Sequence, residues 1–352
     1  MRIACFSFVW VALLLAASPS PAQVESITTL KEGGARLDWL GEQIAFDMLG
    51  PGDFFAVYVM NSDGQESRCV TCGHPDLPGR HTGQPAWHPS GRYLVFQAEK
   101  REHIDVRFES VLWPGAGVLN DLWLLNLQTK RATVIREVEN APGRGTLHPH
   151  FSADGRMLSW SEMQERGSLV KGEEAGLWAL MVADFNTDDA SVPRLENVRS
   201  YIPGGPAFYE NHGFSPDGLR LLFSSNFEAE QRVENHIYTL ELNTMLLTRL
   251  TTQDYNEHAQ YSPDGSRIAW MSNTDIRFAG TDYWLMDADG SNKRRLTYFN
   301  KRNHPEYTGE ATAVADLSWR PDGTAFAGYA SKAGAFASKT RPTKIILIEL
   351  SR

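Results

Sequence analysis

A short motif, an aromatic residue followed by a tight turn that ends in glycine, recurs along this sequence. Four copies are nearly alike, a fifth is close and a sixth is degenerate: Phe151–Gly155, Phe214–Gly218, Tyr261–Gly265, Trp319–Gly323, Trp87–Gly91 and Trp39–Gly41. Proline, where present, presets φ at the first central position of the turn. Aspartate caps the turn through its carboxylate, and glycine takes a positive φ. This is hairpin chemistry, so we interpret the repeated aspartates as turn formers: Asp154, Asp217, Asp264 and Asp322.

Apolar residues alternate after each turn, as Leu221 and Phe223 do in one copy. Such alternation predicts a β-strand with one well-packed face. The copy with Phe326 has Gly328 at the second apolar position, which predicts weaker packing there. A further strand with a large central residue and a short strand ending near Leu-Thr follow in most copies, so each repeat supplies four strands.

Six four-stranded repeats, spaced 47 to 64 residues apart, predict an all-β fold, a six-bladed β-propeller. The last repeat stops after its third strand. The segment Ile27–Leu30 precedes the first repeat and reads as the missing strand, so we expect an N-terminal strand to complete the last blade. No amphipathic helices separate the strands, which argues against a two-domain α/β fold.

The N-terminus resembles a secretory leader. Arg2 is followed by an apolar run from Ile3 to Ala17 and then by small residues, which predicts a signal peptide over residues 1–22 and a propeller over 23–352. The run is too short for a comfortable membrane span, which needs about 20 residues. We therefore expect a periplasmic or secreted protein without a membrane span, and a monomer.

Charge and cysteine content narrow the function further. The net charge is −9, and no basic cluster overrides it, which disfavours nucleic acid and anionic membranes as partners. Beyond the leader only Cys69 and Cys72 remain. A local disulfide between them is possible in an oxidising compartment.

Polar residues precede the repeat aromatics, where a propeller would bring the innermost strands together at the channel mouth. Four histidines are candidate metal ligands: His148, His150, His212 and His258. The candidate ligand-binding residues are Gln84, Glu210, Asn211, Glu257, Gln260 and Asp316. Imidazole with carboxylate suits Mn, Zn, Fe or Ni. Without a metal, the same residues suit a carboxylate or sugar ligand, or general-base chemistry. A purely structural role, in which they form hydrogen bonds to water and backbone, is the remaining alternative.

The repeats resemble the TolB-type (WD40-like) propeller repeat of exported bacterial proteins. The resemblance rests on Phe214–Phe223 and Tyr261–Trp270, with weaker copies around Trp87, Phe151 and Trp319. It implies the fold and says little about function. Prolyl oligopeptidase-type enzymes also carry a propeller, but the Gly-x-Ser-x-Gly elbow of their hydrolase domain is missing from this sequence.

Two functions remain open. The first is a non-catalytic binding module that takes a protein, peptide or carbohydrate ligand at its loop-rich face; no catalytic residue is assigned. The second is a metal-dependent lyase or hydrolase acting on acidic sugars. The segment from His148 to His150 resembles the metal motif of oligogalacturonate lyases, which hold a metal with histidines and a glutamine. That resemblance implies His81 as a third histidine, but Gly145 stands where the glutamine is expected.

Overall fold

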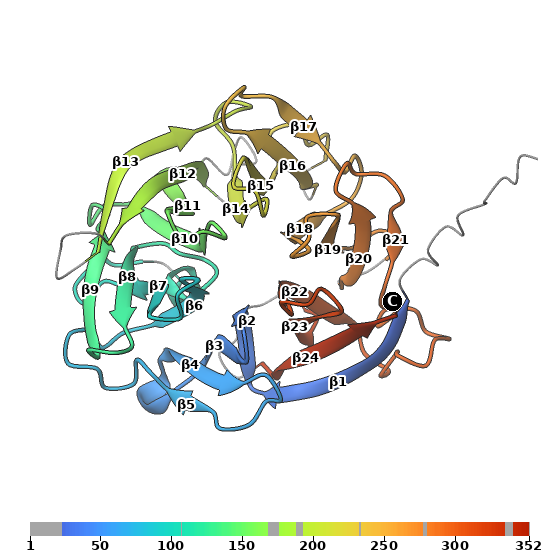
Figure 1. Ribbon diagram of the computed structural model, residues 1–352, viewed down its shortest axis with the longest axis horizontal. Helices are drawn as coiled ribbons and strands as arrows, with labels where there is room; N and C mark the ends of the chain where they lie inside the picture. The colour runs from blue at the N-terminus through green and yellow to red at the C-terminus, as the bar shows by residue number, and fades with distance from the viewer. Residues whose placement is uncertain are drawn as a thin grey trace, which may run out of the picture.

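The computed structural model describes residues 23–106, 108–167, 176–187, 193–231, 234–276, 280–334 and 341–351. These residues form six four-stranded antiparallel sheets set around a common axis (Figure 1), which confirms the all-β, six-bladed propeller. Two short 3₁₀ helices, η1 (Pro51–Asp53) and η2 (Glu109–Leu112), interrupt the loops. No helix among the described residues is long and apolar enough to cross a membrane. The predicted leader lies outside the described residues.

Each blade runs from an innermost strand near the axis to an outermost strand at the rim. Blade 1 contains β2 (Gly34–Leu40), β3 (Gln43–Leu49), β4 (Phe55–Asn61) and β5 (Arg68–Cys69). Blade 2 contains β6 (Thr82–Trp87), β7 (Tyr93–Glu99), β8 (Asn120–Asn126) and β9 (Arg131–Arg136). Blade 3 contains β10 (Gly145–Phe151), β11 (Met157–Glu165), β12 (Leu177–Asn186) and β13 (Arg194–Tyr201).

The second half of the ring follows the same plan. Blade 4 contains β14 (Tyr209–Phe214), β15 (Arg220–Ser225), β16 (His236–Glu241) and β17 (Leu247–Arg249). Blade 5 contains β18 (Asn256–Tyr261), β19 (Arg267–Ser272), β20 (Asp282–Asp287) and β21 (Arg294–Arg295). Blade 6 contains β22 (Thr312–Trp319), β23 (Ala325–Lys332) and β24 (Thr343–Leu350), with β1 (Val24–Glu32) as its fourth strand.

The N-terminal strand closes the ring. Strand β1 pairs antiparallel with β24, from Val24 opposite Leu350 to Glu32 opposite Lys344, and Figure 1 shows the two strands side by side. The backbone N–H of Gln23 donates to Ser351 Oγ at 2.7 Å. Because β24 would otherwise expose an unpaired edge, this pairing both completes blade 6 and protects it.

The repeated turns use the predicted chemistry. In the turns of blades 3 to 6 the aspartate accepts a hydrogen bond from the backbone N–H two residues later, as Asp217 does from Leu219 at 3.0 Å. The glycine after it has φ near +70°, for example +71° at Gly218. Only glycine adopts this conformation at little cost, so the turns fix where each innermost strand ends.

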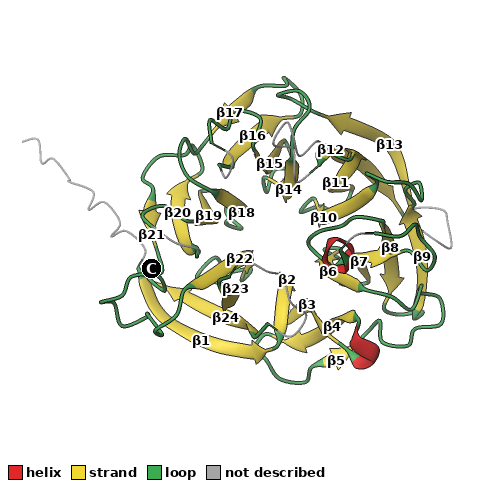
Figure 2. Ribbon diagram, turned by 180° about the vertical axis from the view of Figure 1, so that it is seen from behind, coloured by secondary structure: helices red, strands yellow, loops and turns green. Residues whose placement is uncertain are grey.

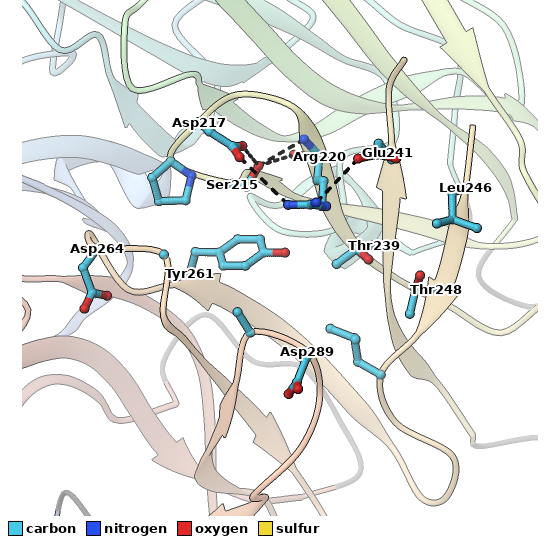
Figure 3. Close-up of a pocket in the computed structure, with 14 residues that line it drawn as sticks. Ser215, Asp217, Arg220, Thr239, Glu241, Leu246, Thr248, Tyr261, Asp264 and Asp289 are labelled. Atoms are coloured by element: carbon cyan, nitrogen blue, oxygen red, sulfur yellow. Dashed lines mark hydrogen bonds and ion pairs between the residues drawn. The ribbon is translucent and has the colours of Figure 1, made fainter. Parts of the chain in front are cut away.

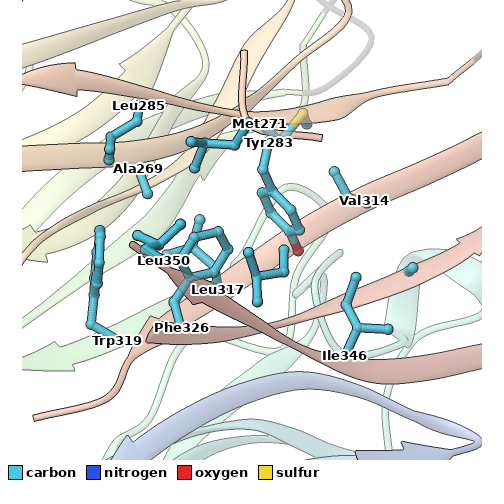
Figure 4. Packing of buried hydrophobic residues seen from close by; sticks show 13 residues of the cluster. Ala269, Met271, Tyr283, Leu285, Val314, Leu317, Trp319, Phe326, Ile346 and Leu350 are labelled. Carbon is cyan, nitrogen blue, oxygen red and sulfur yellow. The ribbon is translucent and has the colours of Figure 1, made fainter. Parts of the chain in front are cut away.

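The apolar core lies between neighbouring blades. Figure 4 shows one such cluster, in which Leu285 of blade 5 packs with Phe326 and Ile346 of blade 6. The weaker packing expected at Gly328 is not what the structure shows. The hydroxyl of Tyr283, from blade 5, occupies that space: a Cβ at Gly328 would lie 2.1 Å from it. Glycine there admits the buried tyrosine, whose hydroxyl donates to Ala315 O at 2.8 Å.

Cys69, the last residue of β5, and Cys72 form a disulfide. Strand β5 lies at the rim of blade 1 (Figure 1), so this bond is remote from the axis. The long loop between β7 and β8, which carries η2, instead covers the inner part of blade 2 (Figure 2). This long loop therefore lies beside the inner strands of blade 2.

We predict that ring closure requires β1. A chain that starts at Gly33 lacks the outer strand of blade 6, exposes the edge of β24 and loses the packing of Leu30 against Ile345 and its neighbours. Its thermal unfolding should occur several degrees below that of a chain starting at Gln23, with a broader transition, by circular dichroism. Equal melting curves would contradict this role.

Candidate metal site at the channel mouth

A β-bulge interrupts every innermost strand just before the repeat aromatic. The strand register shifts by one between Gly83 and Ala86 in blade 2, between Leu147 and His150 in blade 3, and at equivalent places in the other blades. In four blades one residue at the bulge has a positive φ: Gln84 (+51°), His148 (+51°), Gly213 (+88°) and His258 (+49°). Bulges re-aim side chains and recur next to functional sites.

The residue three positions before the aromatic is therefore a ring position, one from each blade. In chain order these residues are Arg36, Gln84, His148, Asn211, His258 and Asp316. All of them except Arg36 are among the site residues predicted from the sequence. Aligning the repeats on Trp39 would have found Arg36 too, because it occupies the same position in the degenerate first copy.

In blades 1 and 2, the charged side chains at and beside these ring positions neutralise each other. Arg36 donates through Nε and Nη2 to both carboxylate oxygens of Asp47, at 2.7 Å each, and Asp47 also accepts the backbone N–H of Gln84 at 2.8 Å. The amide oxygen of Gln84 then accepts the backbone N–H of His148 at 2.8 Å. These bonds join three blades, and the fork between guanidinium and carboxylate leaves neither charge uncompensated.

Blades 3 to 6 contribute the other half, where two imidazoles and three carboxylates converge. One ligand atom each from His148, His258 and Asp316 lie within 4.8 Å of one another, and so do atoms from Glu210, Glu257 and His258. Asp316 Oδ1 is 3.3 Å from His258 Nδ1 and 3.6 Å from His148 Nδ1. Since blades 3 and 6 are opposite each other in the ring, this cluster, which we call the channel cluster, crosses the axis.

One nitrogen of each imidazole in the channel cluster has no hydrogen bond among the described residues. His148 Nε2 lies 2.5 Å from Glu210 Oε1, yet it has no hydrogen bond among the described residues because the two groups are not aligned for one. His258 Nδ1 is likewise without a hydrogen bond in the described part of the chain. The side chain of His148 is 3% exposed. A buried imidazole with an unsatisfied nitrogen needs an explanation, and the binding of a metal ion there would provide one.

Glu257 is held by its own set of donors. Asn235 Nδ2 donates to Glu257 Oε1 at 2.7 Å, and the hydroxyl of Tyr255 donates to Glu257 Oε2. Glu257 Oε2 also lies 3.7 Å from His258 Nε2. Tyr255 and Asn235 were not predicted from the sequence, because nothing in the repeat pattern marks them as neighbours of Glu257.

Burial and charge shift the pKa values in opposite directions within the channel cluster. Burial lowers the pKa of His148 to about 4. Burial alone would also lower the pKa of His258, but the negative charges of Asp316 and Glu210 outweigh burial and raise this pKa to about 10. Burial and the neighbouring Glu210 raise the pKa of Glu257 to about 8. Without a cation the cluster thus favours a protonated His258 beside Asp316 and a proton on one of the paired carboxyls.

The remaining predicted residues lie around the channel cluster rather than within it. His150 and His212 belong to neither ligand group, and their ring centroids lie 6.5 and 5.9 Å from that of His148. His212 Nε2 pairs with Ser224 Oγ at 3.0 Å. The two amides join blades: Asn211 Nδ2 donates to His148 O at 2.8 Å, and Gln260 Oε1 accepts the N–H of Trp319 at 2.9 Å.

The histidine set suggested by the lyase motif is not gathered here. His81 Nδ1 accepts the backbone N–H of Phe55 at 3.0 Å, and its Nε2 faces Glu99 and Glu109 at 3.9 and 3.6 Å. His81 is in neither ligand group among the described residues. Blade 5 supplies the second clustered imidazole instead, through His258.

A groove of about 680 Å³ lies between blades 4 and 5, on the side of the tight turns. Figure 3 shows its lining, where Asp217 pairs with Ser215 and Glu241 pairs with Arg220. These groups satisfy one another and serve the turn at Gly218. We therefore assign the candidate site to the channel cluster and not to this groove.

No protein-family model matches the sequence, and no curated protein matches it. Among solved structures, TolB from Acinetobacter baumannii is similar, with a TM-score of 0.55 and 16% identity over 88% of this chain, which covers 65% of that one. An oligogalacturonate lyase in complex with manganese has a TM-score of 0.51 and 14% identity, over 94% of this chain and 95% of that one. An oligogalacturonate lyase from Vibrio parahaemolyticus gives a TM-score of 0.51 at 14% identity, over 92% of this chain and 93% of that one. At these identities the likeness concerns the fold, a TolB-like β-propeller.

We predict that replacing Gly213, the bulge glycine of blade 4, lowers the stability of the folded protein. In Gly213→Ala, a positive φ costs about 1–2 kcal/mol, and the new Cβ would also lie 3.0 Å from His150 Cβ. Gly205→Ala is the matched control, with φ of +89° and no atom within 4 Å of the new Cβ. Denaturant unfolding should show a larger loss of stability for Gly213→Ala; equal losses would contradict the close contact.

Proposed function

We propose that this protein is an exported TolB-like propeller that binds a divalent transition-metal ion at its channel mouth and presents it to an oxygen-rich ligand. The observation that carries the proposal is the meeting of His148, His258 and Asp316, from three different blades, around one point. Imidazole and carboxylate together are the donor set of Mn²⁺, Fe²⁺, Zn²⁺ and Ni²⁺. Three protein ligands leave coordination positions open for a ligand.

The fit of these residues to an ion rests on charge as well as on distance. Glu210, Glu257 and Asp316 are buried or nearly so, and no lysine or arginine of the described chain forms an ion pair with any of them. Without a cation, only protons on His258 and on one of the paired carboxyls reduce this buried negative charge. A divalent cation would offset it and would also occupy the unpaired imidazole nitrogens.

The surroundings support a binding role. His258 and Asp316 each retain 14% exposure of the side chain, so a ligand can reach the ion from the mouth. The loop that carries η2 borders a mainly apolar pocket of about 330 Å³, lined by Phe108, Val111 and Met163 among others. A protein, peptide or carbohydrate ligand that contacts both the ion and these loops is the partner we infer.

A metal-dependent lyase acting on acidic sugars is the second candidate. What favours it is that an oligogalacturonate lyase of similar fold was solved with manganese. When bound, the ion would neutralise a substrate carboxylate. Glu210 and Glu257, which lie within 4.8 Å of His258, are the candidates in this chain for the proton acceptor that elimination needs. Unsaturated product from oligogalacturonate, followed by ultraviolet absorbance, separates this candidate from a pure binding function.

We predict stoichiometric metal binding that depends on the channel cluster. The protein, stripped with chelator and dialysed against Mn²⁺, should retain the ion by elemental analysis and melt at a higher temperature, since a ligand of the folded state stabilises it. Asp316→Asn and His258→Ala should weaken Mn²⁺ affinity by about tenfold or more.

The control for these variants is His74→Ala, which removes a partly exposed histidine that contacts Lys130 O and lies outside the channel cluster. It should bind Mn²⁺ like the wild type. A protein that binds none of Mn²⁺, Fe²⁺, Zn²⁺ or Ni²⁺, with a melting temperature indifferent to chelator, would rule the proposal out.

Export is part of the proposal and has its own test. Cleavage after Ala22 would leave Gln23 to pair with Ser351 and β1 intact. The intact mass of protein recovered from the periplasm or medium should therefore correspond to a chain that begins at Gln23. A mass that includes Met1, or recovery only from the cytoplasm, would contradict a cleaved leader.

A further inference from the structure

The groove between blades 4 and 5 shares no residue with the channel cluster and lies at the end of the blades that carries the tight turns (Figure 3). Its volume of about 680 Å³ is within the range of about 300–1,000 Å³ that ligand pockets have. Blade 4 supplies one wall, with Thr239, Thr248 and Leu246, and the turns of blade 5 supply the other, with Asp264 and Asp289. The groove is therefore large enough for a ligand of its own.

Negative charge is in excess along the groove. The lining contains one guanidinium, that of Arg220, and four carboxylates: Asp217, Glu241, Asp264 and Asp289. Arg220 lies 3.9 Å from Asp217 and 3.5 Å from Glu241, so its charge is used on the wall of blade 4. The lining has a net charge of −3, and a ligand that bears positive charge is complementary to it.

The two carboxylates on the wall of blade 5 are ionised and have no cation bound to them. Asp264 and Asp289 accept hydrogen bonds from serines of their own turns, which lower their pKa values, that of Asp264 to about 2. Arg267 and Lys293 also lower these pKa values through space, but neither forms an ion pair with them in the described part of the chain. A cationic group of a ligand could therefore pair with either carboxylate.

A buried hydroxyl also points into the groove. Tyr261 is 9% exposed, its ring packs in the core between blades 4 and 5, and Figure 3 shows its hydroxyl directed between the two walls. That hydroxyl has no hydrogen bond among the described residues. The same repeat position is Phe214 in blade 4 and Phe151 in blade 3, so core packing does not require a hydroxyl there. A polar group of a ligand would satisfy it.

Exposed apolar side chains border the groove. Leu246, which lines it, is 62% exposed, and Met245 and Leu219 beside it are 50% and 45% exposed. The turns that carry these residues are joined by backbone hydrogen bonds, from Leu242 N–H to Leu219 O and from Glu241 N–H to Leu246 O, each at 2.9 Å. Exposed apolar residues gathered on one surface are typical of a protein interaction site.

The corresponding groove between blades 2 and 3 lacks these features. Its volume is similar, about 640 Å³. However, each carboxylate of its lining forms an ion pair with an arginine: Asp154 with Arg156, Asp184 with Arg199, and Glu196 with Arg194. Unpaired carboxylates and an exposed leucine therefore distinguish the groove between blades 4 and 5 from a general property of the propeller.

We propose that the groove between blades 4 and 5 docks a basic segment of a partner protein, in which lysine or arginine accompanies aliphatic residues. The cationic side chains would pair with Asp264 and Asp289, and an aliphatic side chain would cover Leu246. The hydroxyls of Tyr261 and Thr239 would bond to the backbone of the segment. The same net charge repels anionic lipids, nucleic acids and acidic sugars. This surface needs no metal ion and is independent of the proposed function.

The test is fluorescence anisotropy with a labelled peptide of three Lys-Leu-Gly repeats, in buffer with chelator so that no metal ion takes part. Wild type should bind this peptide and should not bind the matching peptide of Glu-Leu-Gly repeats. Asp264→Asn combined with Asp289→Asn should weaken binding about tenfold. The two charges are lost, whereas an amide oxygen can still accept the hydrogen bonds of each turn.

The matched control is Asp154→Asn combined with Asp322→Asn, which removes the same charge from the turns of blades 3 and 6 and should leave binding unchanged. Tyr261→Phe should weaken binding about three- to tenfold, because it removes one hydrogen bond and keeps the ring. Thermal unfolding checks that each variant is folded.

Two results would overturn the proposal. The first is equal binding of the basic and the acidic peptide to wild type, or no binding of either. The second is equal loss of affinity in the Asp264 and Asp289 double variant and in its control, which would assign the effect to net charge and not to the groove. Neither result bears on the ion at the channel mouth, because the measurement excludes metal.

Discussion

The bulge in each innermost strand is the constraint on which the site depends. Successive side chains of a regular strand point to opposite faces, so Glu257 and His258, which are adjacent in sequence, would not reach one place. The register shift after Glu257 and the positive φ of His258 turn both toward the axis. The same bulge, repeated around the ring, aligns one polar position from each of six distant repeats. Without it, the propeller would have a channel but no cluster across it.

The ring of polar residues is divided into two unlike halves. On the side of blades 1 and 2, Arg36 and Asp47 form an ion pair, and Asp47 joins the two blades by accepting the backbone N–H of Gln84. On the side of blades 3 to 6, carboxylates and imidazoles meet with nitrogens left unbonded among the described residues. Unsatisfied polar atoms alone do not mark the site, because Gln84 Nε2 of blade 2 is also buried without a hydrogen bond among the described residues. We place function in the half where carboxylates and imidazoles meet.

The fold was predictable from local chemistry. A turn ending in a glycine of positive φ, such as Gly218, sets the end of each innermost strand, and the count of such turns gives the number of blades. The closing strand could be predicted from Ile27 to Leu30 because the last repeat is one strand short. The packing at Gly328 could not, because the group that fills the space, Tyr283, belongs to another blade and is distant in sequence.

The sequence predicted which residues line the channel mouth, but it did not predict which of their side chains meet. Histidines before the repeat aromatics mark the channel, and the sequence named His148, His258 and Asp316 among them. Which of these side chains meet depends on the ring's dimensions and on the bulges, so the structure alone separates His258 from His150 and His212. The resemblance to oligogalacturonate lyases implied His81 as a ligand, but His81 contacts Glu99, Glu109 and Phe55 instead of the channel cluster.

The most direct measurement of the central claim is anomalous diffraction from crystals of the protein loaded with Mn²⁺. The account predicts an anomalous peak on the channel axis, within bonding distance of His148, His258 and Asp316. A well-ordered crystal with no peak there, or with His148 and Asp316 directed away from each other across an open channel, would contradict it.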